Sequence, residues 1–182
     1  FANNPSFNIF EIYAYNLMHD GNVSSGNDDL SMDLRTGASG SEASARSSNA
    51  LFYHRDRRHG GDGVADSMQT DAAGHEGIRM SRGGTYGAVQ NRGTYSKIRV
   101  FNPHRKDGNG STIQARVFVH IMHMGLVNGN GSGSYMYSGE TWGNYDNNTL
   151  TATGFSFKGA GNNLFATSGC QPMVLIFGVK ES

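Results

Sequence analysis

The densest group of potential metal-binding side chains lies between positions 54 and 62. Its members are His54, Asp56, His59 and Asp62. His54 and Asp56 are two residues apart, so on a strand they would share a face and could both reach one cation. Three arginines among them, Arg55, Arg57 and Arg58, would repel that cation. The segment therefore favours an interaction patch or a solvated loop over a metal site. We predict that the arginines contact another subunit, because the planar guanidinium fork suits interfaces.

A second pair of histidines, His120 and His123, is three residues apart in an apolar stretch. On a strand this spacing places the two rings on opposite faces, where they cannot easily bind one metal ion. Two half-buried histidines are the simpler expectation, and a metal shared between subunits on a symmetry axis is the alternative. We predict no metal and no other cofactor.

Enzyme motifs are sparse in this sequence. There is no Gly-x-Ser-x-Gly elbow, no phosphate-binding loop and no zinc-binding helix motif. We assign no catalytic residue and predict that the protein is not an enzyme. A glycan-degrading enzyme stays open as an alternative, because glycosidase carboxylates can come from distant strands.

Four aromatic residues between positions 135 and 145 could form a sugar-binding surface. They are Tyr135, Tyr137, Trp142 and Tyr145, and Gly and Asn residues surround them. Aromatic rings stack on sugar faces, and amides can hydrogen-bond to hydroxyls. The alternative is that these aromatic residues belong to the core or to a subunit interface, where such residues are common.

Composition limits the class of protein. The chain has 182 residues, and we expect one domain over positions 1–182, or one part of a longer or processed polypeptide. With 15 basic and 15 acidic residues, no net field would draw it to nucleic acid. No apolar run approaches the ~18 residues of a membrane span, so we expect no membrane insertion.

Short alternating apolar segments joined by Gly-, Asn- and Ser-rich turns predict many strands and no helices. Three of the expected strands are Asn8–Leu17, Leu30–Leu34 (half exposed) and Ile113–Met124. Long polar loops are expected at Thr36–Ser48 and Tyr53–Gly63, and a long irregular connection is expected from there through Ala73. The predicted fold is all-β, an antiparallel two-sheet β-sandwich with jelly-roll or related Greek-key topology and long loops.

The most continuous apolar run is Met173–Phe177, which is followed by Gly178, Val179 and Lys180. A short apolar run bounded by turn residues is typical of a strand buried on both faces. We therefore expect this strand to lie in the core.

The stretch Thr149–Lys180 resembles the C-terminus of phage virion proteins of the β-sandwich type, which include tail-fibre, decoration and minor structural proteins. An aromatic strand, a Gly/Asn loop, an aromatic-x-x-Ser-Gly turn and a final apolar strand carry the resemblance. The matching residues are Gly154, Phe155, Phe157, Asn163, Phe165, Ser168, Gly169, Phe177, Gly178, Val179 and Lys180. Two features depart from the pattern. Cys170, Gln171 and Pro172 stand where the family usually runs straight into the strand, and the final aromatic residue is Phe177 where Tyr is commoner.

The resemblance implies a structural role and no chemistry. We therefore expect a non-enzymatic virion component that forms a homo-oligomer and contacts other virion proteins. A carbohydrate- or receptor-binding module of the same fold, recognising a host-surface glycan, is the alternative.

Overall fold

The computed structural model describes residues 1, 3–17, 30–36, 43–44, 50–59, 66–72, 78–80, 94–105, 117–129, 133–145, 151–158 and 172–180. For residues 36, 43–44, 50–59, 66–72, 79, 126–129, 133–137, 145 and 158 it describes the backbone alone. Within these ranges the fold is all-β and antiparallel, without a helix, as predicted.

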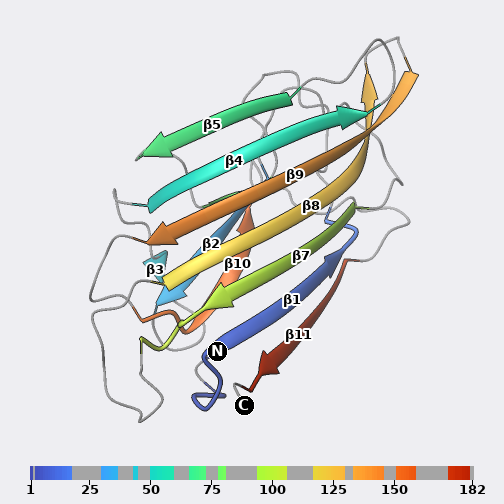
Figure 1. Cartoon of the computed structure of the whole chain (residues 1–182). Coiled ribbons are helices and arrows are strands. Elements are labelled where there is room, and N and C mark those ends of the chain that lie inside the picture. Colours follow the sequence, from blue (N-terminus) through green and yellow to red (C-terminus); the bar gives the residue numbers. More distant parts are fainter. Residues whose placement is uncertain are drawn as a thin grey trace.

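The larger sheet has seven strands in the order β11-β1-β7-β8-β9-β4-β5 (Figure 1). Their bounds are β1 Ile9–Tyr15, β4 Ala50–His59, β5 Asp66–Ala72, β7 Thr94–Phe101, β8 Val117–Gly129, β9 Gly133–Tyr145 and β11 Met173–Val179. Asn16 and Asn102, which follow β1 and β7, have φ angles of 57° and 55°. A left-handed residue cannot continue the extended backbone, so each asparagine ends its strand. Asn tolerates this conformation better than most residues.

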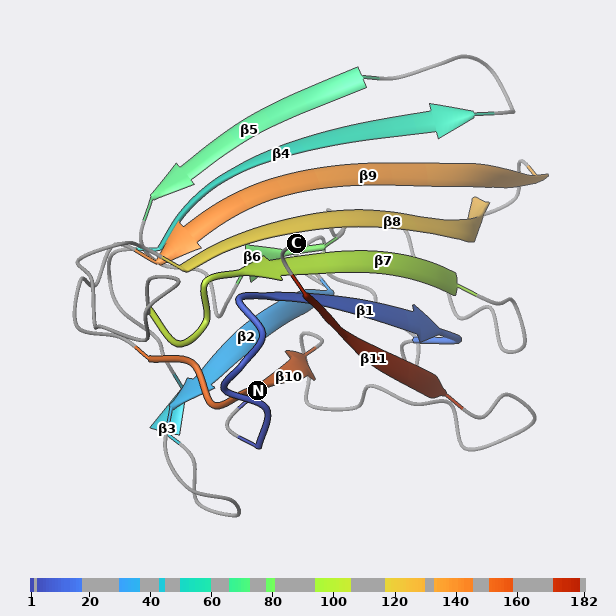
Figure 2. The same ribbon diagram turned by 60° about the horizontal axis from the view of Figure 1, so that its bottom comes forward.

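The smaller sheet lies against one face of the larger (Figure 2). Its strands are β2 Ser31–Thr36, β3 Ala43–Ser44, β6 Ile78–Arg79 and β10 Gly154–Lys158. β2 pairs with β10, and it also pairs with β3 and β6. Buried residues of both sheets form one apolar cluster, in which Ile12, Ile98 and Ile121 of the larger sheet join Met32, Leu34 and Ile78 of the smaller.

Alternation in the central strands matches the sequence prediction. In β1, Phe10, Ile12 and Ala14 are buried, and in β8 Val117, Val119, Ile121 and His123 are buried. The residues between them, such as Tyr13 and Met122, lie on the opposite face. We call this opposite face of the larger sheet, turned away from the smaller sheet, the outer face.

The prediction that the C-terminal run is buried is wrong. β11 is a strand, but it lies at the edge of the larger sheet, and Met173, Val174, Leu175, Ile176 and Phe177 are 39–53% exposed. Among the described strands β11 contacts only β1. No described strand of the smaller sheet contacts it.

Other local predictions also need correction. The predicted polar loop Tyr53–Gly63 is strand through His59, and β5 occupies much of the connection expected before Ala73. β4 pairs with β9 on one side and with β5 on the other. Polar side chains do not prevent this pairing, because its hydrogen bonds are made by the backbone. β2 is not half exposed, since Ser31 and Asp33 are buried along with Leu30, Met32 and Leu34. Most of the loop expected at Thr36–Ser48 lies outside the described residues, although β3 falls within it.

Candidate interaction surface

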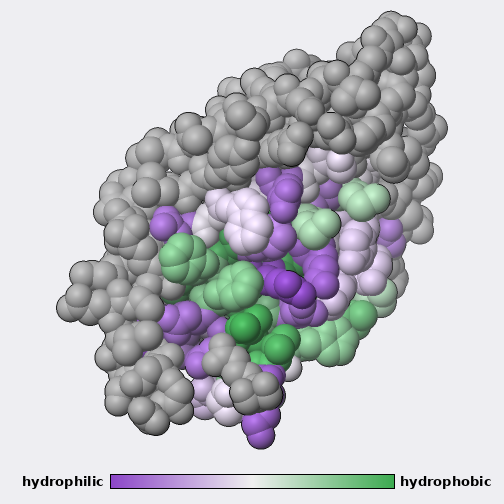
Figure 3. All heavy atoms as spheres, viewed as in Figure 1, coloured by the Kyte–Doolittle hydropathy of each residue, from purple (hydrophilic) through white to green (hydrophobic). Residues whose placement is uncertain are grey.

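The outer face is assembled from strands far apart in the sequence. One row of directly opposed residues runs across it from Phe177 through Glu11, Arg99 and His120 to Trp142. These residues come from β11, β1, β7, β8 and β9 in that order. In the same view as Figure 1, apolar and polar side chains alternate over the described centre of this face (Figure 3). A surface of this kind can offer both stacking and hydrogen-bonding contacts to a partner.

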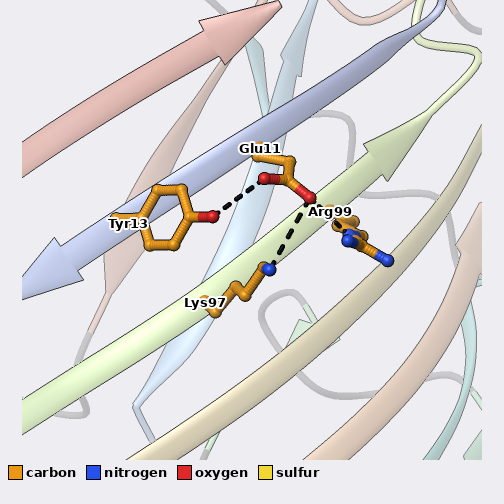
Figure 4. A network of polar contacts seen from close by, with 4 residues as sticks. All are labelled: Glu11, Tyr13, Lys97 and Arg99. Atoms are coloured by element: carbon orange, nitrogen blue, oxygen red, sulfur yellow. Dashed lines mark hydrogen bonds and ion pairs between the residues drawn. The ribbon is translucent and has the colours of Figure 1, made fainter. Parts of the chain in front are cut away.

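Glu11 is the centre of the first polar group on the outer face (Figure 4). Its Oε1 atom accepts a hydrogen bond from Arg99 Nε at 2.7 Å and lies 3.7 Å from Lys97 Nζ. Its Oε2 atom accepts a hydrogen bond from the Tyr13 hydroxyl at 2.8 Å. The Lys97 ammonium also lies 5.4 Å from the centre of the Tyr13 ring. The group therefore holds one carboxylate among two cations and a phenol.

This setting lowers the pKa of Glu11 from its ordinary value of 4.5. The Tyr13 hydroxyl contributes most, because a hydrogen bond donated to the carboxylate favours the charged form. Arg99 and Lys97 act in the same direction, and partial burial opposes them. Glu11 is thus held as an anion.

Glu11→Gln is expected to lower the free energy of unfolding by about 0.5–1 kcal/mol at pH 7, the range of partly exposed ion pairs. A lowered folded-state pKa means that the contribution of Glu11 is complete above its ordinary pKa of 4.5. The contribution is lost as the pH falls through the lowered value. Urea unfolding of wild type and variant from pH 7 to pH 3 checks this. The two stabilities should converge in acid, and a constant difference would contradict the assignment.

Tyr13→Phe is the matched control for this prediction, because it deletes the largest cause of the lowered pKa and keeps the ring. In this variant the free energy of unfolding should change less between pH 7 and pH 3 than in wild type. Some change should remain, because Arg99 and Lys97 still favour the charged form of Glu11.

The second polar group contains Trp142, His120 and Glu140. The His120 and Trp142 rings are stacked, with centroids 3.7 Å apart and planes at 9°. His120 Nε2 and Glu140 Oε1 are 2.9 Å apart, at hydrogen-bonding distance. Trp142 is 49% exposed in spite of the stacking. His120 covers one face of the indole, and the exposed part of the ring can offer an aromatic surface to a partner.

Of the four aromatic residues predicted to bind sugar, the structure describes the side chain of Trp142. All four lie in β9, but Tyr135, Tyr137 and Tyr145 stand at odd spacings from Trp142. On a strand such positions belong to the other side from Trp142, and the side chains of these tyrosines lie outside the described part. That the four residues form one sugar-binding surface stays a prediction. His120, the cross-strand neighbour of Trp142, and Glu140, two residues before Trp142 in β9, were missed. Strand alternation could have placed Glu140 on the face of Trp142, but the sequence carries no signal for His120, because contacts between strands depend on register.

Arg55, Arg57 and Arg58, predicted to contact another subunit, lie in β4, and their side chains are outside the described part. The register places Arg55 opposite Glu140 of β9 and Arg57 opposite Ser138. The positions of Arg55 and Arg57 thus belong to one face of β4, and the position of Arg58 belongs to the other face. Their role in assembly stays a prediction.

The two histidines of β8 lie on opposite faces, as predicted. His120 is on the outer face, whereas His123 is buried with its Nδ1 atom 2.7 Å from Ser96 Oγ. Among the described residues, no group of three or more His, Cys, Asp and Glu side chains is arranged to hold a metal ion. In the same part of the chain, no helix is long and apolar enough to cross a membrane.

The edge strand β11 is the third feature of this surface. Its Leu175 and Phe177 lie on the outer face opposite Tyr13 and Glu11, and the Phe177 and Tyr13 rings meet edge to face at 5.8 Å. Its Val174 and Ile176 lie on the inner face, opposite Ala14 and Ile12. The strand exposes apolar side chains on both faces.

Comparison with protein-family models, curated proteins and solved structures gives no match to this chain.

Proposed function

We propose that the chain is a non-enzymatic structural protein that assembles into a homo-oligomer, as a component of a virus particle. The observation that supports this most is the exposed apolar edge of the larger sheet. Five consecutive large apolar residues, Met173–Phe177, are each at least 39% exposed. An edge strand also offers unpaired backbone N–H and C=O groups, and stable monomers protect such edges with charges, prolines, bulges or covering segments. β11 has no charged residue and no proline.

We also propose a fold type for the two sheets. Two antiparallel layers around one apolar cluster suit a β-sandwich of jelly-roll or related Greek-key type, the architecture of the virion proteins that Thr149–Lys180 resembles. Of the residues that carry this resemblance, Gly154, Phe155 and Phe157 fall in β10, and Phe177, Gly178 and Val179 fall in β11. A decoration, fibre or tail element would place the chain in the extracellular particle, in contact with other virion proteins.

Glu11 does not suit the role of general acid in a glycosidase. A glycosidase needs one carboxyl group with a raised pKa as its general acid. Glu11 has the opposite setting, because Tyr13, Arg99 and Lys97 favour its charged form.

Ile176→Lys tests the assembly role. The wild-type chain should sediment as an oligomer, and the variant should sediment as a monomer, because a lysine would be forced into an apolar contact. Met122→Lys is the matched control. Met122 is 47% exposed on the outer face but lies in β8, away from the edge, so this variant should assemble like wild type. Circular dichroism of both variants would show that they stay folded.

A monomeric wild-type chain would contradict the assembly role. A role as a glycan-binding module would then be favoured if a neutral oligosaccharide changed the fluorescence of Trp142, the one tryptophan of the chain. Turnover of a polysaccharide would favour the enzyme instead.

A further inference from the structure

We infer that the partner of β11 is β11 of a second copy, paired antiparallel with Ile176 on the two-fold axis. This pairing would join the two seven-stranded sheets into one continuous sheet. The inference rests on the proposed function, because it takes β11 as the assembly edge and specifies its partner.

The composition of the two sheet edges favours a second copy of β11 over the other edge. β11 has the sequence MVLIFGV, whereas β5, at the opposite edge, has the sequence DSMQTDA. A head-to-tail contact would place two aspartates of β5 beside apolar residues, and desolvating a carboxylate without a partner is costly. Two β11 strands instead match apolar residues with apolar residues. The resulting contact is isologous and closed, as in most homodimers.

Strand geometry then restricts the register. Successive residues of a strand direct their backbone groups alternately to the two sides, and their side chains alternately to the two faces. Two copies of one strand that pair edge to edge about an axis normal to the sheet can therefore match only positions of the same parity. One residue must lie on the axis. Ile176 is the middle residue of Met173–Val179, so only this choice pairs the whole strand.

The side chains fit this register on both faces. On the outer face, Leu175 of each copy would lie opposite Phe177 of the other, beside the Tyr13 ring that Phe177 already contacts. On the inner face, Val174 would lie opposite Gly178. The Phe7 ring fills the space where a Cβ atom of Gly178 would stand, so Val174 would meet this ring. The two Ile176 side chains, each 53% exposed in one copy, would cover each other.

Cysteine cross-linking tests the register in the full chain. The one natural cysteine is first removed by Cys170→Ser, and Leu175→Cys, Ile176→Cys and Phe177→Cys are then introduced singly. Opposed residues have Cα atoms about 4.5–5.5 Å apart, within disulfide range, whereas diagonal neighbours about 7–8 Å apart are beyond it. Under mild oxidation, Ile176→Cys should give mainly a covalent dimer. Leu175→Cys and Phe177→Cys should stay uncoupled alone and form a mixed dimer when combined.

The results would distinguish a wrong register of the β11 pair from a wrong assembly edge. If Ile176→Lys abolishes assembly but Ile176→Cys does not cross-link, β11 is the assembly edge and the symmetric register is wrong. Equal cross-linking at all three positions, or an open-ended series of oligomers in sedimentation, would also overturn the inference. If Ile176→Lys leaves the oligomer intact, the assembly edge itself is wrong and both fail.

Discussion

Ile98→Ala is expected to lower the free energy of unfolding by about 2–5 kcal/mol, the range for truncating a buried isoleucine. Ile98 is fully buried in β7 and lies in a row with Ile12 of β1 and Ile121 of β8, which are also fully buried. The smaller sheet covers this row, so the lost methyl and methylene groups would leave a cavity between two layers. Chemical denaturation monitored by circular dichroism measures the change.

Ile176→Ala is the matched control, because the row continues from Ile12 to Ile176 in β11. The substitution is chemically identical, but Ile176 is about half exposed. At a protein concentration where the chain is monomeric, the loss should stay within about 1 kcal/mol. Equal losses at the two positions would show that β11 is covered in the monomer, and would remove the basis for assembly through this edge.

Gly143→Ala is expected to cost about 1–3 kcal/mol, the range for overpacking a core. A Cβ atom at Gly143 of β9 would lie 2.8 Å from Cδ1 of Ile78 and 3.1 Å from its Cγ1 and Cγ2 atoms. Ile78 belongs to β6 of the smaller sheet and is fully buried, so it has little room to move. Thermal and urea unfolding would both report the loss.

A second substitution tests whether this contact between the sheets causes the loss. Ile78→Val deletes Cδ1, the atom nearest to the added methyl group, so the double variant should lose less stability than the sum of the two single variants. Gly125→Ala in β8 is the control. Its Cβ atom would lie 3.2 Å from Cγ2 of Thr94, which is partly exposed and can adjust. A loss at Gly125 as large as that at Gly143 would contradict the explanation.

The sequence by itself predicted the faces of the central strands. Ile12 alternates with Glu11 and Tyr13, and Val119 with Phe118 and His120. In a strand, successive side chains take opposite faces whatever the neighbouring strands are. The same local rule placed His120 and His123 on opposite sides. The all-β class followed from these segments and from the turn-forming residues between them.

The sequence did not predict which strand lies at an edge. Met173–Phe177 has the composition of a strand buried on both faces, and burial depends on whether another layer covers it. Among the described strands β11 contacts β1 alone and none of the smaller sheet, and the same residues are exposed. In β2 the error is opposite, since Ser31 and Asp33 look like surface residues and are buried.

The candidate site depended even more on tertiary structure. The sequence pointed to Trp142 but not to His120, which lies opposite Trp142 through the pairing of β8 with β9. The His120 ring stacks on Trp142 and lies at hydrogen-bonding distance from Glu140. Glu11 of β1 likewise forms ion pairs with Lys97 and Arg99 of β7. Local alternation decides which face a side chain takes. Strand order and register decide which side chains meet there, and both arise from pairings between residues far apart in the sequence.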